Sequence, residues 1–115
     1  MPALTTFTPS QLGTTATWTT LAAATVYTFE NTGNTILLLN NAATTTVATN
    51  NIITLVTPST IAGLAIADQE VSVNGAGTIK SVGRLARTAF NSGSQASFTA
   101  AGTDIANLRA MVIEP

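Results

Sequence analysis

Short extended segments separated by turn residues are the feature that most constrains how this chain can fold. Runs rich in β-branched or aromatic residues recur along the sequence, and turn signals separate them at intervals of about 8–12 residues. No run carries a helical stripe of useful length. Because this spacing is typical of an antiparallel sandwich or barrel, we predict an all-β protein, an antiparallel β-sandwich that is jelly-roll-like.

The expected strands lie between turns whose residues tolerate left-handed backbone conformations. The clearest turns are Asn-Thr-Gly-Asn at 31–34 and Asn-Gly-Ala-Gly at 74–77. Residues 35–39 are apolar at successive positions, which favours a strand buried on both faces. The runs that we expect to form strands are residues 25–29, 35–39, 44–49, 52–57, 69–73, 78–82, 95–100 and 108–113.

Three connecting regions carry weaker signals. Asn50-Asn51 stands between two expected strands and favours a hairpin turn. Residues 84–90 and 104–110 are each suited to one helical turn. Residues 59–68 indicate a loop that is held by apolar anchors, namely Ile61, Leu64 and Ile66.

The composition divides the chain into two parts. Residues 1–24 are rich in threonine and alanine, and Pro2 and Pro9 lack the backbone donors that central strands need. We therefore predict an extended N-terminal arm over residues 1–24 and a β-sandwich domain over residues 25–115. The arm does not resemble a secretion signal, since it has no basic segment and no continuous apolar segment.

The composition also leaves few groups for catalysis. The chain has no histidine and no cysteine, and 8% of its residues are charged, whereas enzymes take their acids, bases and nucleophiles mostly from these residues. A Ser-His-Asp arrangement, a disulfide and a thiolate zinc site are therefore all impossible. We expect a protein that is not an enzyme and that uses no cofactor and no metal.

Asp68 and Glu70 are the closest pair of carboxylates in the sequence, and two interpretations of this pair are possible. On a strand, Asp68 and Glu70 would project to the same side with their Cα atoms about 7 Å apart, which is compatible with a glycosidase. The alternative is a solvated strand edge beside a loop. We favour the alternative because the sequence offers neither an aromatic platform nor a second acidic cluster.

Aromatic and cationic residues are the candidates for an interface. The net charge of −1 argues against nucleic-acid binding, which needs clustered cations. Trp18 could anchor the arm either on its own domain or on a partner, and the arginines could bridge to carboxylates within the chain or across subunits. The candidate interface residues are Phe7, Trp18, Arg84, Arg87 and Arg109.

A series of segments after residue 26 has the order and spacing of a known family. The segments are residues 27–41, 62–68 and 71–77, the Phe90-Asn91 step and a closing strand. In this order they resemble small phage virion proteins of the head decoration, or capsid cement, type. The resemblance implies an all-β domain outside a capsid, often a trimer at local three-fold positions, and it brings no catalytic residues. It does not extend to the arm.

The expected function follows from this resemblance and from the composition. We expect a non-enzymatic decoration protein that binds the outer surface of a phage capsid and stabilises contacts between major capsid protein subunits. Its partners would be the major capsid protein and copies of itself, with a trimer favoured, and neither nucleic acid nor a membrane. It would be made in the host cytoplasm and reside on the virion. One face or end of the sandwich would bury apolar surface on the capsid, and deletion of residues 1–20 would weaken attachment while the domain stays folded.

Two other functions remain open from the sequence. A head–tail or tail-surface protein of a virion would use the same fold and the same lack of chemistry. A carbohydrate-binding sandwich module is less favoured, because sugar binders present exposed aromatic rings, and most of the few aromatic residues here are needed for the core.

Overall fold

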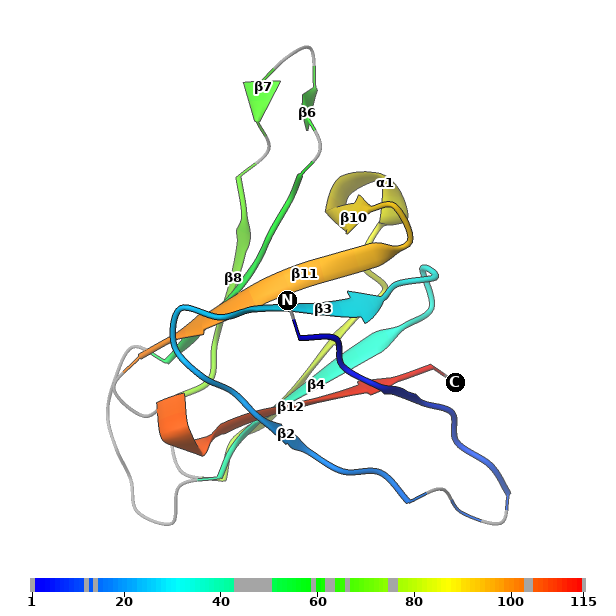
Figure 1. Ribbon diagram of the computed structural model, residues 1–115, viewed down its shortest axis with the longest axis vertical. Helices are drawn as coiled ribbons and strands as arrows, with labels where there is room; N and C mark the ends of the chain where they lie inside the picture. Colours follow the sequence, from blue (N-terminus) through cyan, green and yellow to red (C-terminus); the bar gives the residue numbers. More distant parts are fainter. Residues whose placement is uncertain are drawn as a thin grey trace.

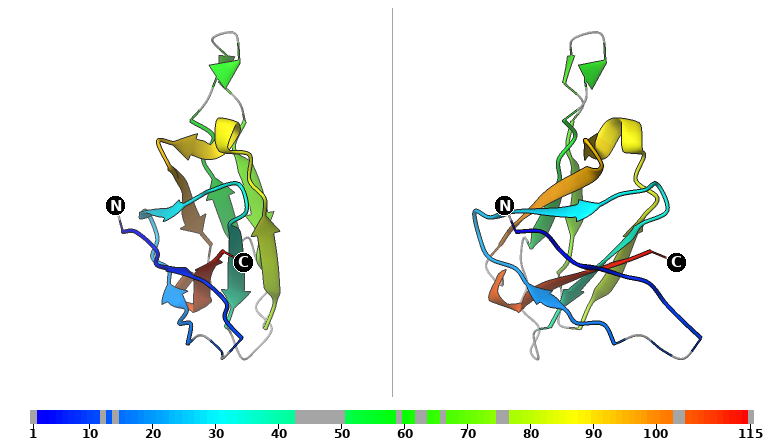
Figure 2. Two further views of the ribbon diagram at one scale, coloured as in Figure 1. Left: turned by 90° about the vertical axis from the view of Figure 1, so that its right-hand side faces the viewer. Right: turned by 45° about the vertical axis from the view of Figure 1, so that its right-hand side comes forward.

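Two β-sheets pack face to face in the computed structural model, with the hydrophobic core between them (Figures 1 and 2). The structure describes residues 2–11, 13, 15–42, 51–58, 60–61, 64–65, 67–74, 77–102 and 105–114. The predicted all-β sandwich is confirmed. Both sheets contain strands that are far apart in the sequence.

Sheet A has β11 as its central strand. Its strands are β3 (Val26–Glu30), β5 (Ile52–Leu55), β8 (Gln69–Ser72), β10 (Asn91–Ser92) and β11 (Gln95–Ala101). The spatial order is β10-β11-β5-β8, and β3 pairs with the other edge of β11.

Sheet B is organised around β12. Its strands are β1 (Thr6–Phe7), β2 (Thr19–Thr20), β4 (Ile36–Asn41), β9 (Ile79–Gly83) and β12 (Leu108–Ile113). The order is β1-β12-β4-β9, and β2 pairs with the same edge of β12 as β1 does. Three small elements complete the fold: the pair β6 (Thr60–Ile61) and β7 (Leu64–Ala65), the helix α1 (Arg87–Phe90) and the 3-10 helix η1 (Ile105–Asn107).

Strand pairing within the sheets is antiparallel, except that β1 runs parallel to β12. The chain passes repeatedly from one sheet to the other: β2, β4, β9 and β12 lie in sheet B, whereas β3, β5, β8 and β11 lie in sheet A. This alternation agrees with a double-sheet arrangement, and the finer jelly-roll assignment stays a prediction.

Alternating side chains of both sheets fill the core, as the two-residue period of a strand requires. Leu37 and Leu39 of β4 point inward from sheet B, and Phe98 of β11 is fully buried on the facing sheet. The Phe98 ring stacks on Tyr27 at a centroid distance of 5.5 Å and lies 6.1 Å from Phe29. These rings occupy the centre of a core that is otherwise mostly aliphatic.

A buried asparagine fixes the corner between β3 and β4. Asn31, 2% exposed, donates from Nδ2 to the Leu85 carbonyl oxygen at 3.2 Å and to Asn91 Oδ1 at 2.8 Å. Its own Oδ1 accepts the backbone N–H of Gly33 at 3.1 Å. Gly33 has φ of +93°, which favours glycine at this turn. The amide of Asn31 thus joins the turn to the segments on either side of α1.

A second buried asparagine lies where the chain crosses from β8 to β9. The Asn41 side chain donates to the Val73 carbonyl oxygen at 3.1 Å, and its backbone pairs with Gly77 and Thr78. Gly75 and Ala76 of the expected turn at 74–77 lie outside the described residues. The strands on either side of it belong to different sheets, because β8 pairs with β5 whereas β9 pairs with β4.

The N-terminal segment, for which we expected an extended arm, lies against its own domain. Ala3 forms a parallel bridge with Thr28 of β3, and β1 and β2 pair with β12. Leu4 and Leu21 contribute to the core, with exposed fractions of 8% and 3%. The segment thus pairs first with sheet A and then with sheet B.

Most of the expected strands occur within one or two residues of the expected positions, and both expected helical turns occur, as α1 and η1. The expected strand at 44–49 lies outside the described residues, as does the turn proposed for its hairpin with 52–57, apart from Asn51. In the described part, β5 pairs with β11 and β8 instead. In the region expected to form an anchored loop, β6 pairs with β7, and Leu64 is exposed, so its role as an anchor was wrong. Residues 59, 62, 63 and 66 lie outside the described residues, so the expected anchor Ile66 is not tested.

Replacing Asn31 with alanine is expected to destabilise the protein by about 2–3 kcal/mol, because it removes the partners of Leu85, Asn91 and Gly33 in a buried site. Urea unfolding followed by tryptophan fluorescence measures the change. The control is Asn34→Ala, an exposed position in the same turn, which should stay within about 0.5 kcal/mol of the parent. Equal losses for the two variants would contradict the role assigned to Asn31.

The packing of the N-terminal segment predicts that Leu4→Ala costs about 2 kcal/mol, whereas Thr5→Ala at the exposed neighbouring position is nearly neutral. Deletion of residues 1–20 removes Leu4, β1 and β2, so we expect it to lower stability as well as attachment. Urea midpoints of the three variants provide the comparison. An unchanged midpoint for Leu4→Ala would show that the segment does not pack on the core.

Candidate interaction surface

The two outer faces of the sandwich differ in chemistry. On sheet A, the cross-strand register sets Thr99 of β11 beside Thr54 of β5, and Thr54 beside Glu70 of β8. Ser97 of β11 is paired with Thr28 of β3, which is 8% exposed because the N-terminal segment lies beside it. This face is therefore largely polar and is suited to contact with water, as is usual for the outer face of an antiparallel sheet.

The outer face of sheet B carries mainly apolar side chains. Residues at alternate positions point away from the core, and the register arranges them in three rows across the sheet. The rows are Thr20-Arg109-Asn40-Ile79, then Met111-Leu38-Ser81, then Phe7-Ile113-Ile36-Gly83. Ile79 is 61% exposed, whereas most of the other apolar members are half-buried. We call these residues the outer face of sheet B.

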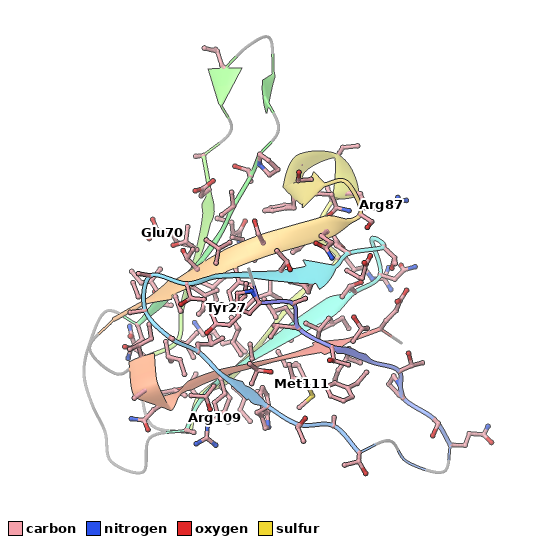
Figure 3. All side chains as sticks on the ribbon, viewed as in Figure 1. Tyr27, Glu70, Arg87, Arg109 and Met111 are labelled. Carbon is pink, nitrogen blue, oxygen red and sulfur yellow. The ribbon has the colours of Figure 1, made fainter. Side chains whose placement is uncertain are left out.

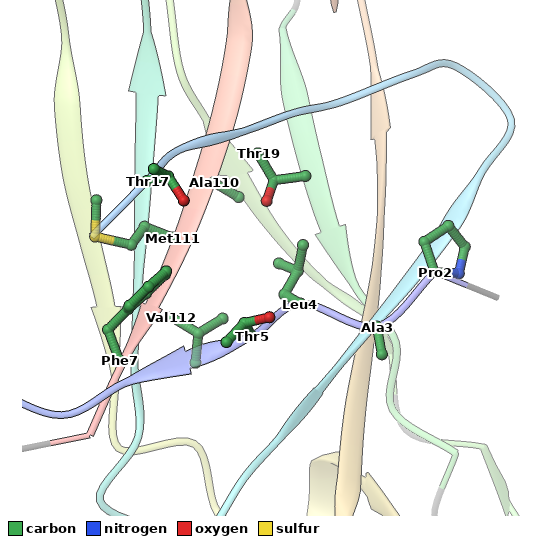
Figure 4. Close-up of a pocket in the computed structure, with 10 residues that line it drawn as sticks. All are labelled: Pro2, Ala3, Leu4, Thr5, Phe7, Thr17, Thr19, Ala110, Met111 and Val112. Carbon is green, nitrogen blue, oxygen red and sulfur yellow. The ribbon is translucent and has the colours of Figure 1, made fainter. Parts of the chain in front are cut away.

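A groove opens where β1 and β2 diverge along β12 (Figure 4). Its volume is about 370 Å³. Its floor is apolar, with Ala110, Met111 and Val112 of β12, and exposed threonine hydroxyls stand at its rim. The residues that line it are Pro2, Ala3, Leu4, Thr5, Phe7, Thr17, Thr19, Ala110, Met111 and Val112, and none of them is charged. We call this feature the β1–β2 groove.

Three of the five predicted interface residues lie along the β12 side of sheet B. Phe7 pairs with Ile113 and lines the β1–β2 groove. Trp18 is half-buried and directly precedes β2, which pairs with Arg109 and Ala110 of β12. Arg109 points outward from β12, and its buried Nε has no hydrogen-bond partner among the described residues. Phe7 and Trp18 belong to the N-terminal segment and Arg109 to the last strand, so the fold brings together residues from the two ends of the sequence.

The other two predicted interface residues lie elsewhere. Arg84 is exposed between β9 and α1, with φ of +56°. Arg87 is exposed on α1 (Figure 3), and its side chain lies over the β3–β4 turn, where a Cβ on Gly33 would stand 3.6 Å from Arg87 Cδ. In the described part of the chain, no ion pair joins these arginines or Arg109 to a carboxylate; Asp104 lies outside it.

Of the two carboxylates considered in the sequence, Asp68 precedes β8 and has a structural role, whereas Glu70 lies on β8. Asp68 Oδ1 accepts two hydrogen bonds from Thr57, one from the backbone N–H and one from the hydroxyl, each at 3.0 Å. Glu70 points outward from sheet A beside Thr54. The two hydrogen bonds between Thr57 and Asp68 join the residue before the β6–β7 segment to the residue after it.

The β6–β7 hairpin projects from the sandwich (Figures 1 and 2). Among the described residues, β6 and β7 pair with each other and with no strand of sheets A or B. No charged residue occurs in the sequence between Pro58 and Asp68. Leu64 of β7 is 73% exposed, so this hairpin presents an apolar side chain to the solvent.

Comparisons with known proteins identify no relative. No protein-family model matches the chain, and neither a curated protein nor a solved structure matches it. A search of the described residues finds no helix that is long and apolar enough to cross a membrane. It also finds no group of three or more acidic, histidine or cysteine side chains that could hold a metal ion.

The sequence interpretation missed the apolar outer face of sheet B and the exposed Leu64. The signal for the first was present: residues 36–39 and 110–113 are apolar at successive positions, so both sides of β4 and β12 are apolar. We interpreted the pattern at residues 35–39 as a strand buried on both faces, and drew no such conclusion for residues 108–113. In the structure Leu37 and Leu39 are buried in the core, whereas Ile36 and Leu38 are half-buried on the outer face.

The link between Asp68 and Thr57 predicts that Asp68→Ala loosens the base of the β6–β7 hairpin, because both hydrogen bonds lose their acceptor. We expect a loss of about 1–2 kcal/mol in stability and faster proteolysis within residues 58–67. Glu70→Gln, two residues further along the chain, is the matched control, because it removes a charge that is exposed on β8. Identical cleavage rates for Asp68→Ala and the parent would contradict the clamp.

Proposed function

We propose that this protein is a non-enzymatic decoration protein of a phage capsid, which attaches to the outside of the shell and strengthens contacts between major capsid protein subunits. The sequence resemblance suggests the capsid. The difference between the two outer faces of the sandwich is the observation that carries the proposal, because it provides a surface for attachment.

The outer face of sheet B is the attachment surface in this proposal. Apolar side chains that cluster on the outside of a domain are typical of a site of protein–protein contact. Leu38, Met111 and Ile113 lie at its centre, and Arg109 lies beside them with an Nε that lacks a described partner. A carbonyl or carboxylate oxygen of a capsid subunit would complete the hydrogen bonding of Arg109 when the face is covered.

The position of the aromatic residues favours this function over carbohydrate binding. All six aromatic side chains lie in the described part of the chain, and each is at least partly buried: Tyr27, Phe29 and Phe98 in the core, and Phe7, Trp18 and Phe90 at intermediate exposure. Stacking on a sugar needs an exposed ring. A head–tail or tail-surface protein would use the same apolar face, and the binding experiment separates it from a capsid protein.

Co-sedimentation with shells assembled from the major capsid protein tests the proposal. Saturable binding at a fixed ratio per capsomer is the expected result, and that ratio identifies the symmetry position. The purified full-length protein is added to compact and to expanded shells in separate experiments. Failure to bind either shell would overturn the capsid assignment and would leave the tail or head–tail alternative.

A charge placed on the outer face of sheet B should weaken attachment. Ile79 is 61% exposed, so Ile79→Asp should fold normally, and burial of its carboxylate against the shell should weaken binding at least about tenfold. Ser92→Asp, at an exposed position of sheet A, is the matched control and should bind like the parent. Attachment through sheet A would reverse the two results.

A further inference from the structure

The connection from β8 to β9 carries the one Asn-Gly step of the sequence, Asn74-Gly75. In such a step the backbone nitrogen of the second residue can attack the side-chain amide of the asparagine, and glycine has no Cβ to obstruct the attack. Asn74 is exposed, and it directly follows the fully buried Val73. Of Gly75, which lies outside the described residues, this chemistry needs only the backbone nitrogen and the missing Cβ.

One hydrogen bond polarises the amide that would be attacked. The side-chain Oδ1 of Asn74 accepts the backbone N–H of Asn51 at 2.9 Å. Asn51 is fully buried and directly precedes β5, so this donor is held in place by the sandwich. Negative charge develops on Oδ1 when a nucleophile adds to Cγ, and a fixed N–H donor stabilises that charge as the donors of an oxyanion hole do.

A second hydrogen bond acts on the nucleophile. The Thr78 hydroxyl donates to the backbone carbonyl oxygen of Asn74 at 2.8 Å. This carbonyl and the nitrogen of Gly75 belong to the same peptide group, so the charge of the deprotonated group is shared between that nitrogen and the oxygen. A donor on the oxygen stabilises the charged form and therefore favours loss of the proton from the nitrogen.

We propose that Asn74 is a site of spontaneous deamidation in the folded protein, and that Asn51 and Thr78 promote the reaction. The deprotonated nitrogen of Gly75 forms a bond to Cγ of Asn74, and the bond from Cγ to Nδ2 breaks. The proton lost by Gly75 is returned through water to Nδ2, which leaves as ammonia. Water then opens the resulting succinimide ring, and the product is aspartate when it attacks Cγ and isoaspartate when it attacks the main-chain carbonyl carbon.

The two products differ in their effect on the protein. Aspartate keeps an oxygen for the N–H of Asn51 and binds it more strongly, because the acceptor is then charged. Isoaspartate lengthens the main chain directly after Val73, whose N–H donates to the Asn51 carbonyl oxygen and whose carbonyl oxygen accepts from Asn41 Nδ2. Asn41 belongs to sheet B, so these bonds connect the two sheets at this corner. Isoaspartate is therefore expected to lower the urea midpoint, whereas Asn74→Asp is expected to keep that of the parent.

Peptide mapping of the purified full-length protein by mass spectrometry tests this inference, and it needs no capsid shell. During incubation in neutral buffer, Asn74 is expected to convert to a mixture of aspartate and isoaspartate, and to convert faster at higher pH. Asn34 is the internal control: it is also exposed, but the β-branched Thr35 follows it, so it should stay unchanged over the same period. Conversion of Asn74 that is no faster than that of Asn34 would overturn the inference.

Variants of Thr78 separate the effect of the structure from that of the Asn-Gly step. Thr78→Val removes the hydroxyl but keeps the shape of the side chain, so conversion of Asn74 should slow at least about threefold. Thr78→Ser keeps a hydroxyl and should convert at the rate of the parent. The parent unfolded in urea lacks both hydrogen bonds and should also convert more slowly than the folded protein. Equal rates for the two variants, or faster conversion in urea, would show that the fold does not promote the reaction.

Discussion

The pairing of β12 is the constraint on which the rest of the structure depends. One edge of β12 is occupied by β4 along the whole strand, whereas the other edge is divided between β1, which runs parallel to it, and β2, which runs antiparallel. Two strands of opposite direction on one edge must diverge, and the β1–β2 groove is the space between them. The N-terminal segment crosses from one sheet to the other, because Ala3 forms a bridge with Thr28 of β3 before β1 pairs with β12. The pairing of β1 and β2 with β12 thus both covers an edge of β12 and forms the groove.

The frequent passage of the chain between sheets explains why asparagines are buried here. A strand that leaves one sheet for the other ends its ladder, and the backbone groups at the corner then need other partners. Asn31 and Asn41 supply those partners, since each amide can both donate and accept. Asn51 is equally buried, and its backbone N–H donates to the side chain of Asn74 at 2.9 Å. These polar contacts fix corners that apolar packing alone would leave undefined.

The sequence predicted the positions of most strands and turns, but it did not predict which strands pair or which turn residues are buried. The runs around Tyr27 and Phe98 were predicted as strands because β-branched and aromatic residues favour a pleated, half-buried backbone. Their partners could not be predicted, since β3 and β11 lie far apart in the sequence and the choice is made by packing. The turn at 31–34 was expected, but the burial of Asn31 was not, because asparagine indicates a turn whether its side chain is buried or exposed. Leu64 was expected to anchor a loop, and only the three-dimensional position of β7 reveals its exposure.

The magnitudes indicate how the outer face of sheet B would hold the protein on a shell. Full burial of a leucine side chain contributes about 1.5–3 kcal/mol, whereas association costs about 4–15 kcal/mol in lost freedom of motion. The gain from Leu38 and Ile113 is limited further because they are already half-buried, and because Arg109 and Asn40 interrupt the apolar rows. A copy that bridges two capsid subunits would meet the second subunit at an effective concentration in the millimolar range, so two weak contacts would reinforce each other. A domain with one modest apolar face and few charged residues is suited to such repeated contacts, in which each contact is weak and the assembly is stable.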